Sequence, residues 1–499
     1  MPNSKPKQFT RPPPKKVKAK SAEPQTADDF QEAADFEEEA GGKWRAGDPA
    51  KSARAFTRAL ELYERGLSKH PQNFDLAYNK ARLMLELSQQ PALVPHIAAS
   101  LETLLHAALE DHRKVLRLDE ENVDALFNTA QVLTRLAEVL HGEGDEDGEK
   151  PAELLHEALE VLSACLSKQE MMFEQQRIDS EARFEEMEND DGVSVTDPMD
   201  ASTSSSATEE QTATIVAPIA ATDLIDTVHA SLAALTTLVA IDDSSEFDTL
   251  ANMAAGLTED KAPRYIALLP ESDQGSARLS TALDRAIFFA GLTDARFSAY
   301  KIDLRAAIEQ LQVFNFRGKE TSAHALFAEA QARQEVVLTA LDREVEAGYI
   351  DGVYCWGQLT AAQTLLSAAA GLGTDDARER KARIYELKAD TEILRYRFAT
   401  MHGAGISDAI HNSAATLLSN ARTFYKGAMQ LGRVLGDEEI VKQSSQRAAL
   451  FDALVRISQG GSATTGDQTE HGVALGGLVE DGLLDDHCAE EMYNILQSS

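Results

Sequence analysis

The sequence is poor in cysteine, in aromatic residues and in basic side chains. Its 499 residues include 3 cysteines and 6% aromatic residues, and 48 Lys and Arg stand against 82 Asp and Glu. Cys165, Cys355 and Cys488 are far apart and odd in number, so they predict neither a disulfide framework nor a paired zinc motif. We therefore expect a reducing environment, with a cytoplasmic and nuclear location.

The shortage of basic residues excludes several classes of partner. A formal net charge of −34 argues against direct nucleic-acid binding, because affinity for phosphate backbones comes largely from clustered Lys and Arg. It argues equally against attachment to anionic membranes. The sequence contains no uninterrupted run of eighteen apolar residues and no apolar signal segment at its start, so we expect no membrane association. An acidic chain attracts basic partners instead.

Apolar residues are abundant and recur at helical spacing. They make up 43% of the chain, and many follow steps of three and four, as in Ala125, Leu126, Thr129, Ala130 and Leu133. Gly and Asp-Gly punctuation separates these stretches. The pattern predicts an all-α fold in which antiparallel helix pairs stack as an α-solenoid.

Changes in composition divide the chain into five predicted segments. Two segments beside the first helical region lack apolar periodicity, so we predict both to be disordered. They are a basic tail and an acidic, Ser-rich linker. The segments are a tail at 1–27, helical repeats at 28–177, the linker at 178–217, a second helical region at 218–458, and a loop with a helical cap at 459–499.

The first twenty residues are strongly basic. They carry no acid and seven bases: Lys5, Lys7, Arg11, Lys15, Lys16, Lys18 and Lys20. The string at residues 15–18 resembles a short nuclear import signal, with Lys15, Lys16 and Lys18 as its candidate residues. The alternative interpretation is a tail that only keeps the protein soluble.

The sign of the charge reverses over residues 21–42. This stretch holds eight acids and no base. Phe30, Ala33, Ala34 and Phe36 alternate with the acids, which predicts a helix with a short apolar face.

The residues after this stretch carry a resemblance to a known repeat. Tyr63, Gly66 and Pro71 lie at the spacing of the aromatic, small and closing proline residues of a tetratricopeptide (TPR) repeat. A second junction of this kind spans residues 115–130. Over residues 40–175 the chain therefore resembles a TPR array, and the resemblance implies a protein-binding scaffold without chemistry of its own.

TPR co-chaperones of Hsp70 and Hsp90 hold a carboxylate with Lys, Asn and Arg side chains, and this clamp is not supported here. The residues at the corresponding positions are Glu37, Gly41, Asn79, Asp124 and Asn128. Only Asn79 matches the clamp, and Glu37 and Asp124 would repel a carboxylate.

An acidic insertion at residues 141–149 resembles the layout of the interrupted-TPR histone chaperones, whose acidic loop is linked to histone binding. Together with the acidic start of the linker, it predicts groups that attract a basic client. The alternative interpretation is solvated acidic segments that promote solubility. The candidate partner-binding residues are Glu143, Asp145, Glu146, Asp147, Glu185, Glu186, Glu188, Asp190 and Asp191.

No motif for catalysis, cofactor binding or metal binding is found. The HExxH and GxSxG patterns are absent, and the loop at 461–466 has P-loop spacing but is followed by Asp467-Gln468. We therefore predict a protein that is not an enzyme and has no cofactor, and that escorts a basic protein such as a ribosomal protein or a histone. The alternative is a scaffold subunit that binds partners through apolar solenoid surface.

Overall fold

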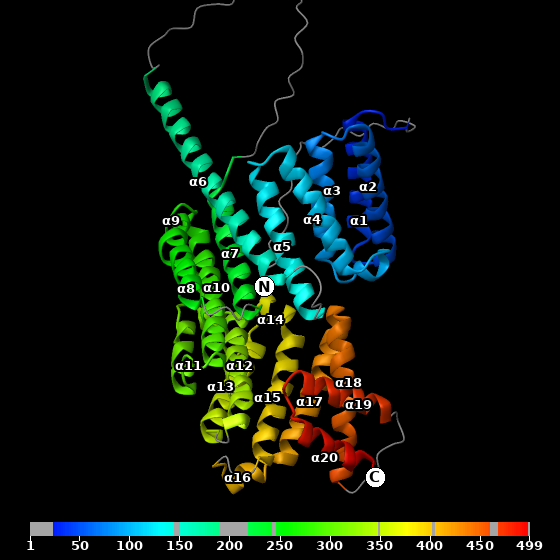
Figure 1. Cartoon of the computed structure of the whole chain (residues 1–499), viewed down its shortest axis with the longest axis vertical. Coiled ribbons are helices and arrows are strands. Elements are labelled where there is room, and N and C mark those ends of the chain that lie inside the picture. Colours follow the sequence, from blue (N-terminus) through cyan, green and yellow to red (C-terminus); the bar gives the residue numbers. More distant parts are fainter. Residues whose placement is uncertain are drawn as a thin grey trace, which may run out of the picture. The chain divides into compact units, whose positions relative to one another are not determined.

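The computed structural model describes residues 23–143, 150–189, 218–241, 246–347, 350–401, 405–459 and 468–497. Within these ranges the regular structure is helical throughout (Figure 1), which confirms the predicted all-α class. The chain forms two compact units. The first comprises Met1–Asp243 and Ala255–Ala277, and the second comprises Ser244–Ala254 and Arg278–Ser499.

In the first unit, successive helices pack in sequence order. Helix α1 lies on α2, α3 on α4, α5 on α6, and α6 on α7, as expected for stacked helix pairs of a solenoid. The helices are α1 Ala27–Trp44, α2 Pro49–Lys69, α3 Phe74–Ser88, α4 Leu101–Leu118, α5 Val123–Glu143, α6 Pro151–Asn189, α7 Ala221–Ile241 and α9 Ala262–Ala267, with a 3-10 turn at Val94–His96 and a π-helix at Gly256–Lys261.

The starts of these helices follow from capping side chains. Thr26 accepts a bond from the Asp29 backbone N–H, and the Asp29 side chain accepts one from Thr26 in return, which makes a capping box at the start of α1. The predicted basic tail therefore ends before Thr26 and not at residue 27. Asn73 caps α3, which begins at Phe74 where the repeat spacing predicts a new helix.

Small residues set the distance between paired helices. A Cβ on Gly66 would lie 2.9 Å from Leu76 Cδ1 and 3.0 Å from Phe30 Cβ, so only glycine fits without movement of its neighbours. Ala130, one of the periodic apolar residues, is 1% exposed. The small residue of the repeat spacing, Gly66, thus lies where two helices approach closely.

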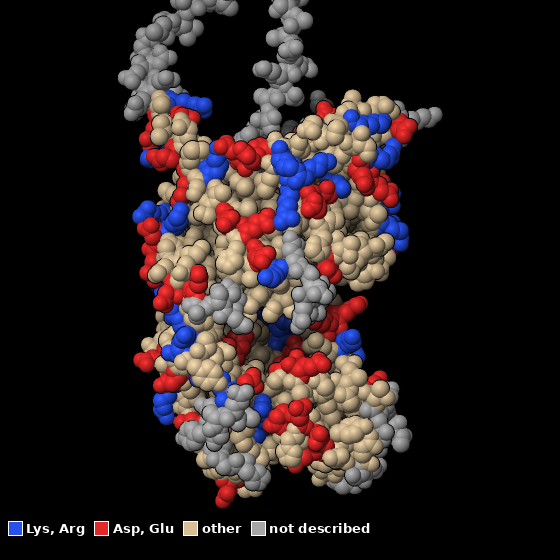
Figure 2. Space-filling view, in the orientation of Figure 1, with Lys and Arg blue, Asp and Glu red and all other residues tan. Residues whose placement is uncertain are grey.

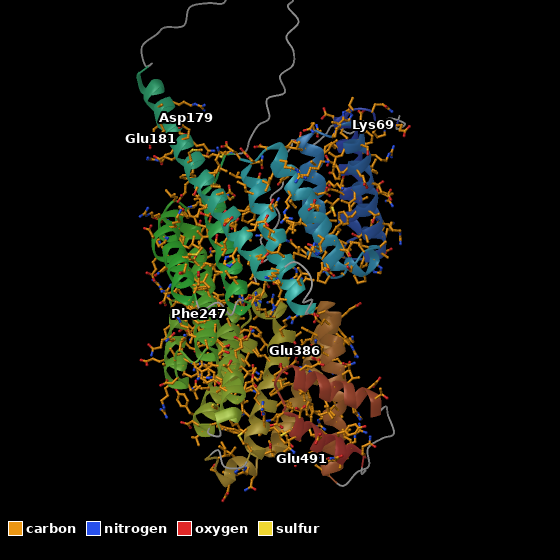
Figure 3. The ribbon with its side chains drawn as sticks, viewed as in Figure 1. Lys69, Asp179, Glu181, Phe247, Glu386 and Glu491 are labelled. Atoms are coloured by element: carbon orange, nitrogen blue, oxygen red, sulfur yellow. The ribbon has the colours of Figure 1, made fainter. Side chains whose placement is uncertain are left out.

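Helix α6 is longer than the sequence predicts, because residues 178–189 are helical and not part of the linker. This end of α6, near Glu181 in Figure 3, extends beyond its neighbouring helices and its described side chains are exposed. Arg177 pairs with Glu174 at 2.7 Å and with Glu181 at 2.9 Å, and such pairs support a helix that has no apolar face. The rest of the predicted linker, 190–217, lies outside the described residues.

Helix α7 is, among the described residues, long and apolar enough to cross a membrane by length and composition. Asp, His, Ser and Thr residues interrupt its apolar residues, so it contains no uninterrupted run of eighteen. In the structure 67% of its most apolar window is buried. Leu232, Leu235 and Leu238 have no exposed surface, which is typical of a core helix.

The second unit is also a series of helices packed on their neighbours, with α12 on α13, α15 on α17, and α17 on α18. Its helices, and those that it shares with the first unit, are α8 Phe247–Ala255, α10 Glu271–Ser298, α11 Leu304–Gln310, α12 Ala323–Ala347, α13 Gly352–Gly371, α14 Asp375–Glu379, α15 Lys381–Thr400, α16 Asp408–His411, α17 Ala414–Leu435, α18 Glu438–Ser458, α19 Gln468–Glu480 and α20 Asp486–Gln497, with 3-10 turns at Leu311–Phe314 and Lys319–Thr321.

The helical stretches α8 and α9, with the π-helix between them, lie at 247–267, inside the second helical region that the sequence predicts at 218–458. Near the end of the chain, α19 begins at Gln468, inside the predicted loop, and the predicted cap consists of two helices. The division between the units falls at the end of α8 and within α10.

Candidate protein-binding surface

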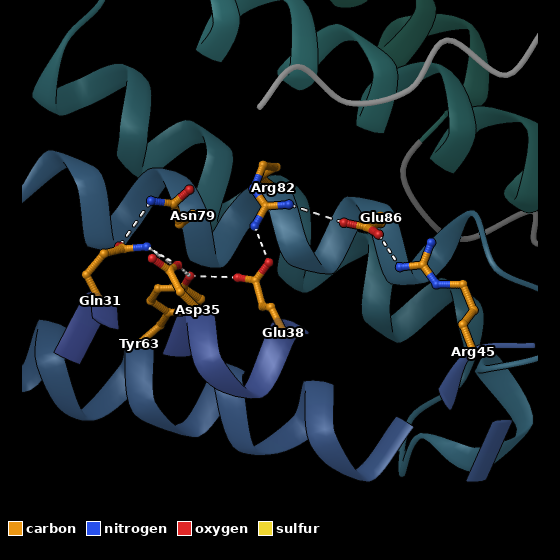
Figure 4. Close-up of polar contacts among 8 residues, drawn as sticks. All are labelled: Gln31, Asp35, Glu38, Arg45, Tyr63, Asn79, Arg82 and Glu86. Carbon is orange, nitrogen blue, oxygen red and sulfur yellow. Dashed lines mark hydrogen bonds and ion pairs between the residues drawn. The ribbon is translucent and has the colours of Figure 1, made fainter. Parts of the chain in front are cut away.

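A row of polar side chains joins α1 to α3 in the first unit (Figure 4). Residues three or four apart on a helix share one face, and the spacings on both helices follow this rule. We call this set the polar ladder: Gln31, Asp35 and Glu38 on α1, Asn79, Arg82 and Glu86 on α3, with Tyr63 from α2 and Arg45 after α1.

In one half of the ladder the hydrogen-bond donors are neutral amide and hydroxyl groups. Gln31 Nε2 donates to Asp35 Oδ1 at 2.6 Å, and Asn79 Nδ2 donates to Gln31 Oε1 at 3.1 Å. The Tyr63 hydroxyl donates to Glu38 Oε1 at 2.6 Å. Three helices are thereby tied together through side chains that are far apart in the sequence.

The other half consists of ion pairs. Arg82 Nη2 donates to Glu38 Oε2 at 2.5 Å, and Arg82 Nη1 donates to Glu86 Oε2 at 3.2 Å. Arg45 pairs with the other oxygen of Glu86. The side chain of Arg82 is 6% exposed, against 16% for Glu38 and 17% for Glu86, so the two carboxylates neutralise a nearly buried guanidinium.

Burial changes the proton affinity of the groups in the ladder. It raises the pKa of the Glu38 carboxyl above its usual range, although the charge of Arg82 favours the ionised form. Burial, and then the charge of Glu38, also raises the pKa of the Tyr63 hydroxyl, so Tyr63 stays a neutral donor. Because its members bind one another, the ladder fixes the register of α1 against α3.

The solvent-facing side of α1 is different, because it is acidic and open. Asp28, Glu32, Asp35, Phe36 and Glu39 follow steps of four, three, one and three, which place them on one side of a helix. All five are exposed, although Asp35 lies at the border with the polar ladder, where it accepts the bond from Gln31, and Glu39 pairs with Lys43 at 2.8 Å. We call this set the α1 outer face.

Phe36 corrects the predicted apolar face of this helix. Phe30 and Ala34 are fully buried, as predicted, but Phe36 is 69% exposed. The reason is helical geometry, since two residues from Ala34 is a rotation of about 200°, to the opposite side of the helix. The α1 outer face therefore presents an aromatic ring among carboxylates.

The residues that correspond to a carboxylate clamp are engaged within the chain. Glu37 pairs with Arg58 of α2 at 2.6 Å, and Asn79 belongs to the polar ladder. Asn128 is fully buried and donates to the Tyr78 hydroxyl at 3.1 Å. Contacts inside the helical stack occupy all three of these side chains.

The two other clamp positions also lie against the stack. A Cβ on Gly41 would meet the Phe56 ring at 2.8 Å, so this glycine is needed for packing. Asp124 is half-buried in the first turn of α5, and its charge helps to raise the pKa of Tyr78.

The side chains predicted to attract a basic client lie outside the described residues, and those predictions stay untested. Glu143 is the last residue of α5, and Glu185, Glu186 and Glu188 belong to the helical range of α6. The described residues do not include the remaining candidate acids, which are Asp145, Glu146, Asp147, Asp190 and Asp191. They also do not include the import-signal candidates Lys15, Lys16 and Lys18. Sequence reasoning had not singled out the α1 outer face, although its acidic run was visible.

A buried charged cluster in the second unit involves Asp390, Tyr425 and Arg447. Tyr425 donates to Asp390 Oδ1 at 2.5 Å, and Arg447 lies 3.4 Å from the same oxygen and also pairs with Asp481. Burial raises the pKa of Asp390 to about 6 and that of the nearby Glu386 (Figure 3) to about 7. Tyr425 has no exposed surface, so the cluster is part of the packing.

Within the described ranges, no group of three or more His, Cys, Asp or Glu is placed to hold a metal ion. Cys165 and Cys355 are buried and Cys488 is half-buried, and none of the three forms a disulfide. Figure 2 shows acidic and basic side chains interspersed over the face in view.

Comparisons with known proteins extend this description only a little. No protein-family model matches the chain. It is 35% identical over 159 residues to UPF0656 protein C926.02 of Schizosaccharomyces pombe, a match that spans 31% of this chain and 34% of that relative. The chain thus matches about a third of the length of this curated relative.

Among solved structures, the chain is similar to a circular tandem repeat protein with a novel repeat topology and enhanced subunit contact surfaces. The similarity covers 93% of this chain and 97% of the other, at 14% identity and a TM-score of 0.28. A score this low does not define the fold, which is established by the helices themselves.

Proposed function

We propose that this protein is a non-enzymatic, TPR-like binding protein that escorts a basic client such as a ribosomal protein or a histone. The α1 outer face carries the proposal. It presents four exposed carboxylates around an exposed aromatic ring on the first helix of the described stack. Such a face suits a Lys- and Arg-rich segment, whose cations pair with carboxylates and stack on aromatic rings.

The contrast between the two sides of α1 supports this assignment. Acids on the inner side, such as Glu38, are matched to Arg82 at short distance. On the outer face, Glu39 pairs with Lys43 at 2.8 Å, but both side chains are 67% exposed, and exposed pairs of this kind are weak. Long-range attraction between an acidic face and a basic client accelerates association and is weakened by salt.

The test compares two charge-matched variants of the full-length protein. The first changes the four acids of the α1 outer face, as Asp28→Asn, Glu32→Gln, Asp35→Asn and Glu39→Gln. The control changes four exposed acids of the second unit to Gln, namely Glu439, Glu480, Glu490 and Glu491. The probe is fluorescein-labelled decalysine, and its binding is measured by anisotropy from 50 to 500 mM salt.

We expect the first variant to bind decalysine about tenfold more weakly at 50 mM salt, because each of four exposed pairs contributes about 0.3–0.5 kcal/mol. The control is expected to change affinity less than about twofold, since it removes the same net charge elsewhere. Equal weakening in both variants would show that net charge alone attracts the probe. That result, or no binding at all, would contradict the proposal.

A scaffold role is the second candidate, and one observation favours it. Met171 and Ile178 lie seven residues apart on α6 and are 56% and 48% exposed. A helix partner bound there would resist salt, because apolar contacts are not screened. Partners that stay bound at 500 mM salt and are lost from a Met171→Glu/Ile178→Glu variant would favour the scaffold over the escort.

A further inference from the structure

Helix α6 carries an uncharged stripe on the side that faces solvent. Its members follow steps of three and four residues, so they share one face, opposite the buried face that packs on α5 and α7. Every member is exposed. We call this set the α6 outer seam: Ala164, Ser167, Met171, Gln175, Ile178 and Ala182.

The seam differs from its surroundings in charge. It runs for about 27 Å along the helix, at about 1.5 Å per residue, without a charged side chain. Charged residues border it on both sides, with Lys168 and Asp179 on one side and Glu174 and Glu181 on the other. An uncharged stripe between charged flanks is typical of a helix that packs along its length against another helix.

We propose that the α6 outer seam pairs with the same seam of a second copy of this chain, with the two helices antiparallel. The pairing does not depend on the proposed escort function, because it concerns association of the protein with itself. The end of α6 extends beyond the neighbouring helices of the first unit (Figure 1), so a second helix has room to lie along it.

The seam is complementary to itself in this arrangement. If the two-fold axis passes midway between residues 171 and 178, Met171 of one copy faces the partner's Ile178, and Ser167 faces the partner's Ala182. Met171 and Ile178 are 56% and 48% exposed, and they bury one another in the dimer. The small side chains at each end let the helix backbones approach. Since only two residues of the seam are large and apolar, the contact is narrower than that of a core helix.

The charges beside the seam are compatible with the pairing. Arg177 donates to both oxygens of Glu174, at 2.7 and 3.1 Å, so each Glu174 near the two-fold axis is held by a cation of its own helix. Lys168 comes within two residues, about 3 Å along the helix, of the partner's Asp179 on the same side of the seam. Lys168 also pairs with Glu121, which is 71% exposed, and an exposed pair of this kind is weak enough to be shared.

The size of the contact predicts a weak dimer. About a dozen residues of each copy take part, counting the seam and the residues beside it, against about 20–30 in a stable interface of standard size. We therefore expect a dissociation constant on the order of 0.1 mM. Dimers then form at high protein concentration, or where another contact brings two copies together.

The first experiment measures self-association of the full-length protein by sedimentation equilibrium at 150 mM salt. Between 5 and 500 µM protein, the weight-average mass should rise from about 1.1 to about 1.7 times that of the monomer, as a dissociation constant of about 0.1 mM requires. Met171→Glu/Ile178→Glu should stay monomeric. The control, Val434→Glu/Val473→Glu, adds the same charge at residues of the second unit that are 83% and 57% exposed, and should dimerise like the wild type.

Two results of this experiment would overturn the proposal. One is a wild type that is monomeric at 500 µM, which would leave the scaffold candidate standing, since that candidate uses the same apolar residues for a different partner. The other is a dimer that persists in Met171→Glu/Ile178→Glu, because such a dimer would use another surface.

The second experiment tests the antiparallel register by oxidising single-cysteine variants with copper–phenanthroline. Gln175 lies beside the two-fold axis, and helices about 8–10 Å apart bring its two α-carbons to about 6 Å, within the range of a disulfide. Gln175→Cys should therefore give a disulfide-linked dimer. Ala182 lies about 22 Å along the helix from the partner's Ala182, so Ala182→Cys should give none.

The wild type is the control for this cross-linking, because its own cysteines are buried or half-buried. A double variant, Ser167→Cys/Ala182→Cys, should be linked again, since these two residues face each other across the antiparallel pair. Linking of Gln175→Cys and Ala182→Cys alike, as parallel helices would give, or of neither variant, would overturn the inference.

Discussion

Replacing Arg82 by Met should destabilise the first unit by about 2 kcal/mol at pH 7.5. The guanidinium is 6% exposed and binds both Glu38 and Glu86, so its loss leaves two carboxylates without their shared cation. Removing one partner of a buried pair costs about 3–5 kcal/mol. We expect less here, because Glu38 keeps the Tyr63 hydroxyl and Glu86 keeps Arg45. Met replaces much of the apolar stem, so little packing is lost.

The pH dependence of this loss has a definite sign. Burial already holds the pKa of Glu38 above its usual range, and Arg82 is the largest influence that lowers it. Without Arg82 the pKa of the folded state rises further above that of the unfolded chain. The cost of Arg82→Met is therefore smallest below the folded pKa of Glu38, where the carboxyl is neutral with or without Arg82, and it grows as the pH rises through that pKa.

The assay exploits the two tryptophans of the chain, since Trp44 lies in the first unit and Trp356 in the second. In a Trp356→Phe background, urea unfolding followed by tryptophan fluorescence reports on Trp44. Adding Glu38→Gln is expected to remove about half of the cost of Arg82→Met, because no carboxylate is then left unpaired at that position. A cost below about 0.5 kcal/mol, a cost independent of pH, or an equal cost in both backgrounds would refute the reasoning.

Two further predictions concern packing and buried charge. Gly66→Ala should cost about 1–3 kcal/mol, since its Cβ would meet Leu76 at 2.9 Å, whereas Gly42→Ala, with nothing within 4 Å, should be neutral or slightly stabilising in the same unfolding assay. Glu386→Gln should stabilise the second unit by about 2 kcal/mol at pH 8 and by only about 0.5 kcal/mol at pH 5. Burial raises the pKa of Glu386 to about 7, so the stability of the native protein falls as the pH rises from the ordinary carboxyl pKa to about 7 and levels off above it. Exposed Glu379→Gln is the control, and equal effects at both pH values would contradict the assignment.

Helix junctions were predictable where the sequence carries local punctuation. Pro71 and the following Asn73 mark the boundary between α2 and α3, because proline ends a helix and asparagine caps the next one. Elsewhere the structure is helical in spite of residues that disfavour helices. Gly256 and Pro263 lie within the continuous helical stretch from α8 to α9, although both residue types normally argue against a helix.

The extension of α6 was missed for a different reason. Its exposed end has no apolar period, and its stability comes from pairs such as Arg177 with Glu181, which a search for amphipathic pattern does not weigh. Only the α1 side of the polar ladder could be recognised from the sequence. Gln31, Asp35 and Glu38 share one face of α1, but their partners on α3 lie more than forty residues away, and only the packing of the helices brings them together.

The division into units has a consequence for the gene. The second unit begins with Ser244–Ala254, the first unit then takes up Ala255–Ala277, and the chain returns to the second unit at Arg278. No single crossover point in the coding sequence therefore separates one complete unit from the other. The two units cannot be exchanged by a single recombination event as independent modules are, and a frameshift within residues 255–277 removes part of both units.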